Sequence, residues 1–127
     1  MNDRGVMIDL GGQGHELLLT TRAAKLIGQR YGGVDEMTAK LAATGRIDTI
    51  LEEIAWIIAL LANQSIQLHN LRNAGTPKPL LTPEEVELLT APVDLARYQE
   101  AITEAMVKGS RRHVLSQEEM VPNIVSG

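Results

Sequence analysis

The stretch IDTILEEIAWIIALLANQSIQLHNLRN, residues 47–73, decides the fold of this 127-residue chain. Its apolar side chains recur every three or four positions, which predicts a long amphipathic helix. Asp48 stands near its start, and Gly75 and Pro77 follow its end, where helices commonly stop. We therefore expect one long central helix. Its main face carries Ile47, Ile50, Leu51, Ile54, Ile58, Leu61, Leu68 and Arg72.

Two large side chains in the middle of this helix point away from that face. On a wheel of 3.6 residues per turn, Trp56 and Leu60 lie nearly opposite to it, beside Glu52 and Asn63. Tryptophan contributes strongly to binding energy at protein interfaces, so Trp56 and Leu60 are candidate partner-binding residues. Alternatively, the C-terminal helix covers Trp56, because that helix has an apolar stripe that needs a surface to pack against. The sequence leaves both interpretations open.

Upstream of the central helix, two short strand-like runs flank a glycine-rich turn. Residues 6–10 (VMIDL) and 15–19 (HELLL) are separated by GGQG, which predicts a β-hairpin. A phosphate-binding loop would need its glycines to lead directly into a helix, but a second strand follows here instead. We therefore assign Gly12 and Gly14 to backbone conformation. We expect the hairpin to pack on the helices or to pair with a second copy through its edge.

Capping signals and apolar stripes predict further helices on both sides of the central one. Thr20 or Thr21 can cap the first of them, and Gly32 ends it. Thr82 and Glu85 form a capping box for a later helix. The predicted segments are residues 21–31, 34–44, 83–89 and 92–109.

This order of elements predicts an α+β fold that is mostly α. A small N-terminal hairpin packs on a bundle of about four or five helices with one long central helix. A chain of 127 residues is long enough for one good hydrophobic core and too short for two. We place a single domain at residues 1–109 and a loosely ordered C-terminal tail at residues 110–127, where Pro122 interrupts the pattern.

Composition narrows the classes of function. Hydrophobic residues make up 44% and charged residues 22%, as in soluble globular proteins. The longest apolar run, residues 54–62, is far shorter than the roughly 20 residues that cross a bilayer. Twelve basic and 16 acidic residues give a net charge of -4, and the only basic cluster is Lys108 with residues 111–113. We therefore expect neither a membrane nor a nucleic acid as partner.

The sequence shows no arrangement typical of an enzyme. Residues 15–16 (HE) begin like a zinc-protease motif, but position 19, where that motif needs a second His, is Leu. His69 and His113 have no second ligand at a suitable spacing. Residues 52–53 are both Glu, but successive helix residues point about 100° apart. The absence of cysteine excludes disulfides and thiol nucleophiles. We predict no catalytic, cofactor-binding or metal site, and a protein that is not an enzyme.

The order of elements also resembles a known family. After the hairpin come LTTRAAKLIGQRYGG (residues 19–33), a short helix, IDTILEEIAWIIALLANQ (residues 47–64) and LTPEEVELL (residues 81–89) before the last helix. This order looks like that of the tail assembly chaperones of long-tailed phages and of related prophages or gene-transfer agents. The resemblance covers about residues 5–108. It is a pattern of order and spacing, so it assigns no binding residue.

The resemblance implies a non-enzymatic factor of virion assembly in the host cytoplasm. Such chaperones bind the long helical tape-measure protein, keep its apolar segments from aggregating and help to recruit tail-tube subunits. Many members also exist in a longer form made by ribosomal frameshifting. A mostly helical domain with an aliphatic groove suits this role, because such grooves accept amphipathic helices. The alternative is a structural component of the virion, in the tail or the head-tail region, or a small protein-binding adaptor.

Overall fold

Helices dominate the structure, a computed structural model that describes the backbone of residues 5–43 and 45–126 and the side chains of residues 5–43 and 45–110. The fold is α+β and mostly α, with an N-terminal hairpin and a long central helix, as the sequence predicts. In chain order the elements are β1 (Val6–Leu10), β2 (Gln13–Leu17), α1 (Thr21–Tyr31), α2 (Val34–Ala43), α3 (Ile47–Arg72), α4 (Pro83–Leu89), the 3-10 helix η1 (Pro92–Asp94) and α5 (Leu95–Ser126).

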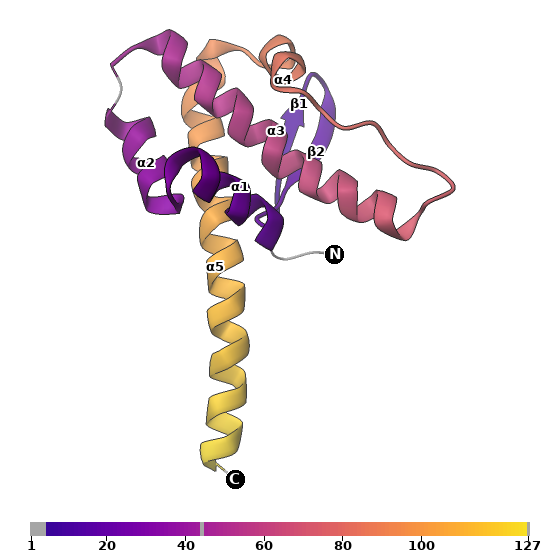
Figure 1. Cartoon of the computed structure of the whole chain (residues 1–127), viewed down its shortest axis with the longest axis vertical. Coiled ribbons are helices and arrows are strands. Elements are labelled where there is room, and N and C mark those ends of the chain that lie inside the picture. Colours follow the sequence, from indigo (N-terminus) through magenta and orange to yellow (C-terminus); the bar gives the residue numbers. More distant parts are fainter. Residues whose placement is uncertain (1–4, 44, 127) are drawn as a thin grey trace.

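Helix α3 runs through the centre of the molecule, and the other elements lie around it (Figure 1). Ile57, Ile58 and Leu61 have no exposed surface, because β2, α1, α4 and α5 all pack against this helix. Among the described residues, α3 alone is long and apolar enough to cross a membrane, but 56% of its most apolar window is buried inside the fold. This burial is what the core helix of a soluble protein shows.

The hairpin turn contains two residues rather than four. Strand β2 begins at Gln13, opposite Leu10, so Gly11 and Gly12 alone connect the strands. Their φ angles are 61° and 89°. Two consecutive positive φ values match the twist of a two-residue hairpin turn, and glycine adopts them without steric cost. The turn assignment of Gly12 is confirmed. The assignment of Gly14 is wrong, because Gly14 lies within β2 opposite Asp9 and is not among the residues with positive φ.

The hairpin is attached to α3 through backbone groups at the end of β2. The Ser65 hydroxyl donates to the Glu16 carbonyl oxygen at 2.8 Å, and the Leu18 N–H donates to the Leu61 carbonyl oxygen at 3.2 Å. Two isolated strands of this length are marginal in water, so packing on a helix is what stabilises them. In this structure β2 lies against α3 and β1 lies against α5.

Helix α1 has the caps that the sequence predicts. The Thr20 hydroxyl accepts a hydrogen bond from the Ala23 N–H at 3.1 Å, and Gly32 ends the helix with φ 102°. The same hydroxyl donates to Gln64, a buried residue of α3 whose side-chain amide donates to the Leu60 carbonyl oxygen at 3.0 Å. One threonine therefore caps α1 and satisfies a buried amide of α3.

The capping box before α4 is also confirmed. The Glu85 N–H donates to the Thr82 hydroxyl at 3.1 Å, and the Thr82 N–H donates to the Glu85 carboxylate at 2.8 Å. The following helix starts later than predicted, because residues 92–94 form η1 before α5 begins at Leu95.

The expected end of the last helix at Gly109 is wrong. Helix α5 continues through this glycine to Ser126, and its C-terminal half projects from the rest of the molecule (Figure 1). A Cβ atom at Gly109 would lie 2.8 Å from the Leu19 Cβ, so the glycine lets α5 pass close to the segment after β2. The Lys108 ammonium group donates to the Gly5 carbonyl oxygen at 3.3 Å beside this crossing. Gly109 is therefore a packing residue and not a helix stop.

The predicted loosely ordered tail, residues 110–127, has a helical backbone through Ser126. Gly127 lies outside the described residues, as do the side chains from Arg111 onward, which include most of the predicted basic cluster.

Candidate functional site

The two candidate partner-binding residues have different surroundings. Leu60 has 9% of its surface exposed and belongs to the hydrophobic core. Trp56 is partly buried, and its ring meets the Tyr31 ring of α1 edge to face, with centroids 5.9 Å apart and planes at 78°. The Arg30 guanidinium carbon lies 4.5 Å from the centre of the Trp56 ring. These contacts come from α1, whereas the alternative expected from the sequence was that the C-terminal helix covers Trp56. Of the two residues, Trp56 alone keeps a substantial exposed part.

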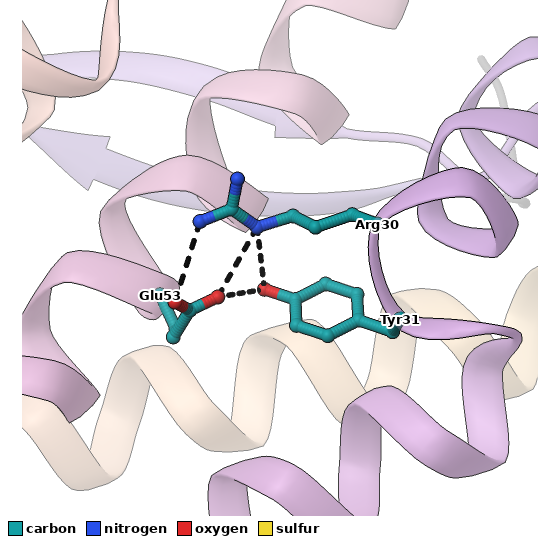
Figure 2. A network of polar contacts seen from close by, with 3 residues as sticks. All are labelled: Arg30, Tyr31 and Glu53. Atoms are coloured by element: carbon teal, nitrogen blue, oxygen red, sulfur yellow. Dashed lines mark hydrogen bonds and ion pairs between the residues drawn. The ribbon is translucent and has the colours of Figure 1, made fainter.

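A polar network beside Trp56 joins α1 to α3. Figure 2 shows Arg30 and Tyr31 reaching from α1 toward the carboxylate of Glu53 on α3. Arg30 donates to both carboxylate oxygens, at 3.2 and 3.3 Å, and the Tyr31 hydroxyl donates to one of them. Glu53 is 7% exposed, so the bidentate partner and the tyrosine compensate the burial of its charge.

The network shifts the pKa values of Glu53 and Tyr31. Burial by itself raises the pKa of Glu53, but the hydrogen bonds from Tyr31 and Arg30 outweigh burial and leave this pKa below its usual value. Burial, together with the hydrogen bond to Glu53, raises the pKa of the Tyr31 hydroxyl. The carboxylate therefore stays ionised and the phenol stays protonated at neutral pH. This arrangement holds α1 on α3, and it presents no free acid or base to a substrate.

An apolar concavity lies between α2 and α5. It is an open groove of about 630 Å³. Apolar side chains form much of its lining, and the described lining residues include no charged one. Those on α2 are Val34, Met37, Thr38, Leu41 and Ala42; those on α5 are Gln99, Ile102, Thr103, Met106, Val107 and Ser110.

This α2/α5 groove has the properties of a surface that accepts apolar side chains. Its volume falls in the range of about 300–1,000 Å³ that is typical of binding pockets. Met37 and Met106 are almost fully buried in its walls, while Val107 is 43% exposed at its edge. Methionine adapts its shape to different neighbours, which suits a site for varied apolar groups. Thr38 and Thr103 add hydroxyl groups to the lining, and the Thr38 hydroxyl already donates to the Val34 carbonyl oxygen at 3.0 Å, so it can only accept a further hydrogen bond.

The sequence predicts each of the two apolar stripes that line this groove, but it does not predict that they lie side by side. The stripe of Val34, Met37 and Leu41 and the stripe that includes Ile102 and Met106 are both visible as helical periodicity. Periodicity shows which residues share a face of one helix. It does not show which two faces lie side by side with space between them.

A second recess lies between the hairpin and the C-terminal part of α3. It has a volume of about 510 Å³, and its lining includes His15, Glu16, His69 and Lys78. The His69 ring nitrogen Nε2 lies 3.2 Å from the Thr76 carbonyl oxygen, so a local contact engages this histidine. Within the part of the chain whose side chains are described, no three His, Asp or Glu residues are grouped closely enough to hold a metal ion.

Comparison with known proteins does not identify a relative. No protein-family model matches the chain, and neither the curated proteins nor the solved structures compared with it give a significant match. The fold and the α2/α5 groove are therefore the observations on which a function can be proposed.

Proposed function

We propose that this protein is a non-enzymatic tail assembly chaperone of a phage or prophage, which acts in the host cytoplasm and binds an amphipathic helix of the tape-measure protein. The observation that carries the proposal is the open apolar groove between α2 and α5. The order of elements that resembles this family of chaperones agrees with the proposal.

The physical basis is the match between the groove and a helical client. A tape-measure protein consists largely of long helices, whose apolar stripes aggregate when they have no partner. Two neighbouring helices whose apolar side chains form the walls of a groove can receive residues spaced i, i+3, i+4 and i+7 along a third helix. Burial of such a stripe removes apolar surface from water at about 25 cal/mol per Å². Binding alone is enough to keep the client soluble, and no reaction is needed.

Co-expression with the cognate tape-measure protein tests the proposal. We expect the client to become soluble and to co-purify with this chain. Val107→Glu places a carboxylate at the edge of the groove and should weaken the complex by at least about tenfold, or ~1.4 kcal/mol. The matched control is Val93→Glu, because Val93 is 89% exposed on η1 and does not line the groove.

Both variants should unfold at the wild-type midpoint, since each adds charge at an exposed position. A client that stays equally insoluble with and without this chain would contradict the proposed function. Equal loss of binding in Val93→Glu and Val107→Glu would show that the client does not bind in the groove. Finding the chain as a stoichiometric component of finished particles would instead support the structural alternative.

A further inference from the structure

Gly14 is a glycine inside β2 whose role the hairpin turn does not explain. A glycine within a strand commonly marks a bulge, a bend at the corner of a barrel or a place where another backbone approaches closely. The two-stranded hairpin has no barrel corner, and its register continues through Gly14 without a bulge. Gly14 also lines the recess between the hairpin, α3 and the connector that follows α3. The explanation that remains is the close approach of another backbone from this recess.

The free edge of β2 faces the recess. In a hairpin with a two-residue turn, the residues that flank the turn form a hydrogen-bonded pair, and the pairs alternate from there. Leu10 and Gln13 flank the turn, so the N–H and C=O groups of Gly14 and Glu16 point away from β1. The Ser65 hydroxyl of α3 agrees with this direction, because it donates to the Glu16 carbonyl oxygen. Within the part of the chain that the structure describes, the backbone groups of Gly14 have no hydrogen-bond partner.

Two asparagines hold the opposite wall of the recess in place. The connector crosses from the end of α3 to α4 as an extended segment, without regular secondary structure in residues 77–82 (Figure 1). Asn63 exchanges hydrogen bonds of 2.7 and 2.8 Å with the backbone of Leu81. Asn70 does the same with the backbone of Lys78, at 2.8 and 3.0 Å. These bonds fix the connector on α3, so the recess of about 510 Å³ is formed in advance and ordering it costs a ligand little.

The lining of the recess suits a ligand that has both apolar and acidic groups. Lys78 contributes an ammonium group that takes part in no ion pair with another described residue, and His15 and His69 add imidazoles. Glu16 alone is acidic among the described lining residues, and its carboxylate lies 3.4 Å from the Ser65 hydroxyl. The apolar lining residues are Leu10, Ala62, Ile66, Pro79, Leu81 and Leu89. A carboxylate on the ligand therefore finds its charge partner at Lys78.

We propose that this recess binds an extended acidic segment of another protein, which adds to the edge of β2 beside Gly14 and places a carboxylate at Lys78. An extended peptide fits because its own N–H and C=O groups pair with those that Gly14 presents. From Gln13 to Glu16 the edge is about 10 Å long at 3.4 Å per residue, which gives room for about three or four residues. The recess shares no lining residue with the α2/α5 groove, so this site does not rest on the helical client.

An NMR titration of the isotope-labelled full chain with synthetic pentapeptides tests the proposal. One pool has Glu at the centre and Val, Ile or Thr at the other positions, and a second pool has Lys at the centre. We expect the amide signals of Gly14 and Lys78 to shift with the Glu pool, and the Lys pool to bind at least about threefold more weakly. A third pool, with Glu at the centre and every backbone nitrogen methylated, should not bind, because it cannot donate to the Gly14 carbonyl oxygen.

Lys78→Glu tests the charge at the recess. The Lys78 side chain makes no hydrogen bond or ion pair with a described residue, so the variant should unfold at the wild-type midpoint. It should bind the Glu pool at least about threefold more weakly than the wild type and prefer the Lys pool. Lys25→Glu is the matched control, because it makes the same change of charge at an exposed position of α1 that does not line the recess. Its affinities should stay near those of the wild type.

Three results would overturn the proposal. The first is an absence of shifts at Gly14 and Lys78 with the Glu pool up to about 5 mM, where binding worth ~3 kcal/mol is still detected. The second is equal binding of the Glu pool and either other pool, or an equal effect of Lys78→Glu and Lys25→Glu. The third is a shift of the same signals with protein concentration in the absence of peptide, which would show that a second copy occupies the recess. None of these results bears on the client in the α2/α5 groove.

Discussion

Replacing Gly109 by Ala tests whether α5 packs closely against the segment after β2. In an exposed helix, Gly→Ala stabilises by about 1 kcal/mol, because alanine loses less backbone entropy on folding. At Gly109 the added Cβ would lie 2.8 Å from the Leu19 Cβ and 2.9 Å from its Cδ2, whereas ordinary contacts are 3.4–4 Å. Overpacking of this kind costs about 1–3 kcal/mol, so the gain in helix propensity is cancelled or reversed.

Gly28 provides a matched control within α1. A Cβ added at Gly28 meets no atom within 4 Å, so Gly28→Ala should give the full stabilisation of about 1 kcal/mol. Urea unfolding measured for both variants should therefore show Gly109→Ala to be less stable than Gly28→Ala by about 1–3 kcal/mol.

A double-mutant cycle with Leu19→Ala identifies the cause. Two of the three Leu19 atoms near the added Cβ, Cγ and Cδ2, are absent in this variant. The penalty of Gly109→Ala should therefore shrink in the Leu19→Ala background by more than the roughly 0.5 kcal/mol that independent sites show. If Gly109→Ala instead stabilises the protein as much as Gly28→Ala does, α5 does not pass Leu19 closely and the packing role of Gly109 is wrong.

Three further predictions follow from the contacts described above. Gly12→Ala should cost about 1 kcal/mol of stability because φ is 89° there, while Gly14→Ala, which meets only the flexible end of Met7 at 3.3 Å, should be nearly neutral in urea unfolding; an equal cost at both positions would contradict this turn geometry. The pKa of Glu53 is lower in the fold than the ordinary value of 4.5, so stability from its ionised form is complete above that value and declines as the pH falls toward the folded pKa. Glu53→Gln should flatten this acid decline, and an unchanged slope would show that the carboxylate is not the titrating group. Trp56→Ala should lower stability by about 2–4 kcal/mol, since the ring packs on α1 and on the core; unchanged stability with a weakened client complex would instead make Trp56 a partner contact.

The sequence by itself determined most of the elements and those of their ends that carry a cap. Thr20, Gly32 and the Thr82 capping box act on backbone groups within a few residues, so these local signals are readable without a structure. Strict helical periodicity likewise identified α3 as the central helix. Gly109 shows the limit of such signals. A glycine that ends a helix and a glycine that admits a neighbouring segment look the same in sequence, and only the approach of Leu19 distinguishes them.

The tertiary structure alone decided which faces meet. A helical wheel placed Trp56 and Leu60 on a second face of α3, but it could not show that α1 covers one with Tyr31 and that the core encloses the other. The α2/α5 groove also depends on which faces meet. It forms because the apolar stripes of α2 and α5, each visible in the sequence, lie side by side without filling the space between them. The physical reason is that caps and periodicity arise from interactions within one or two turns, whereas the pairing of faces depends on how all the elements together exclude water and fill space.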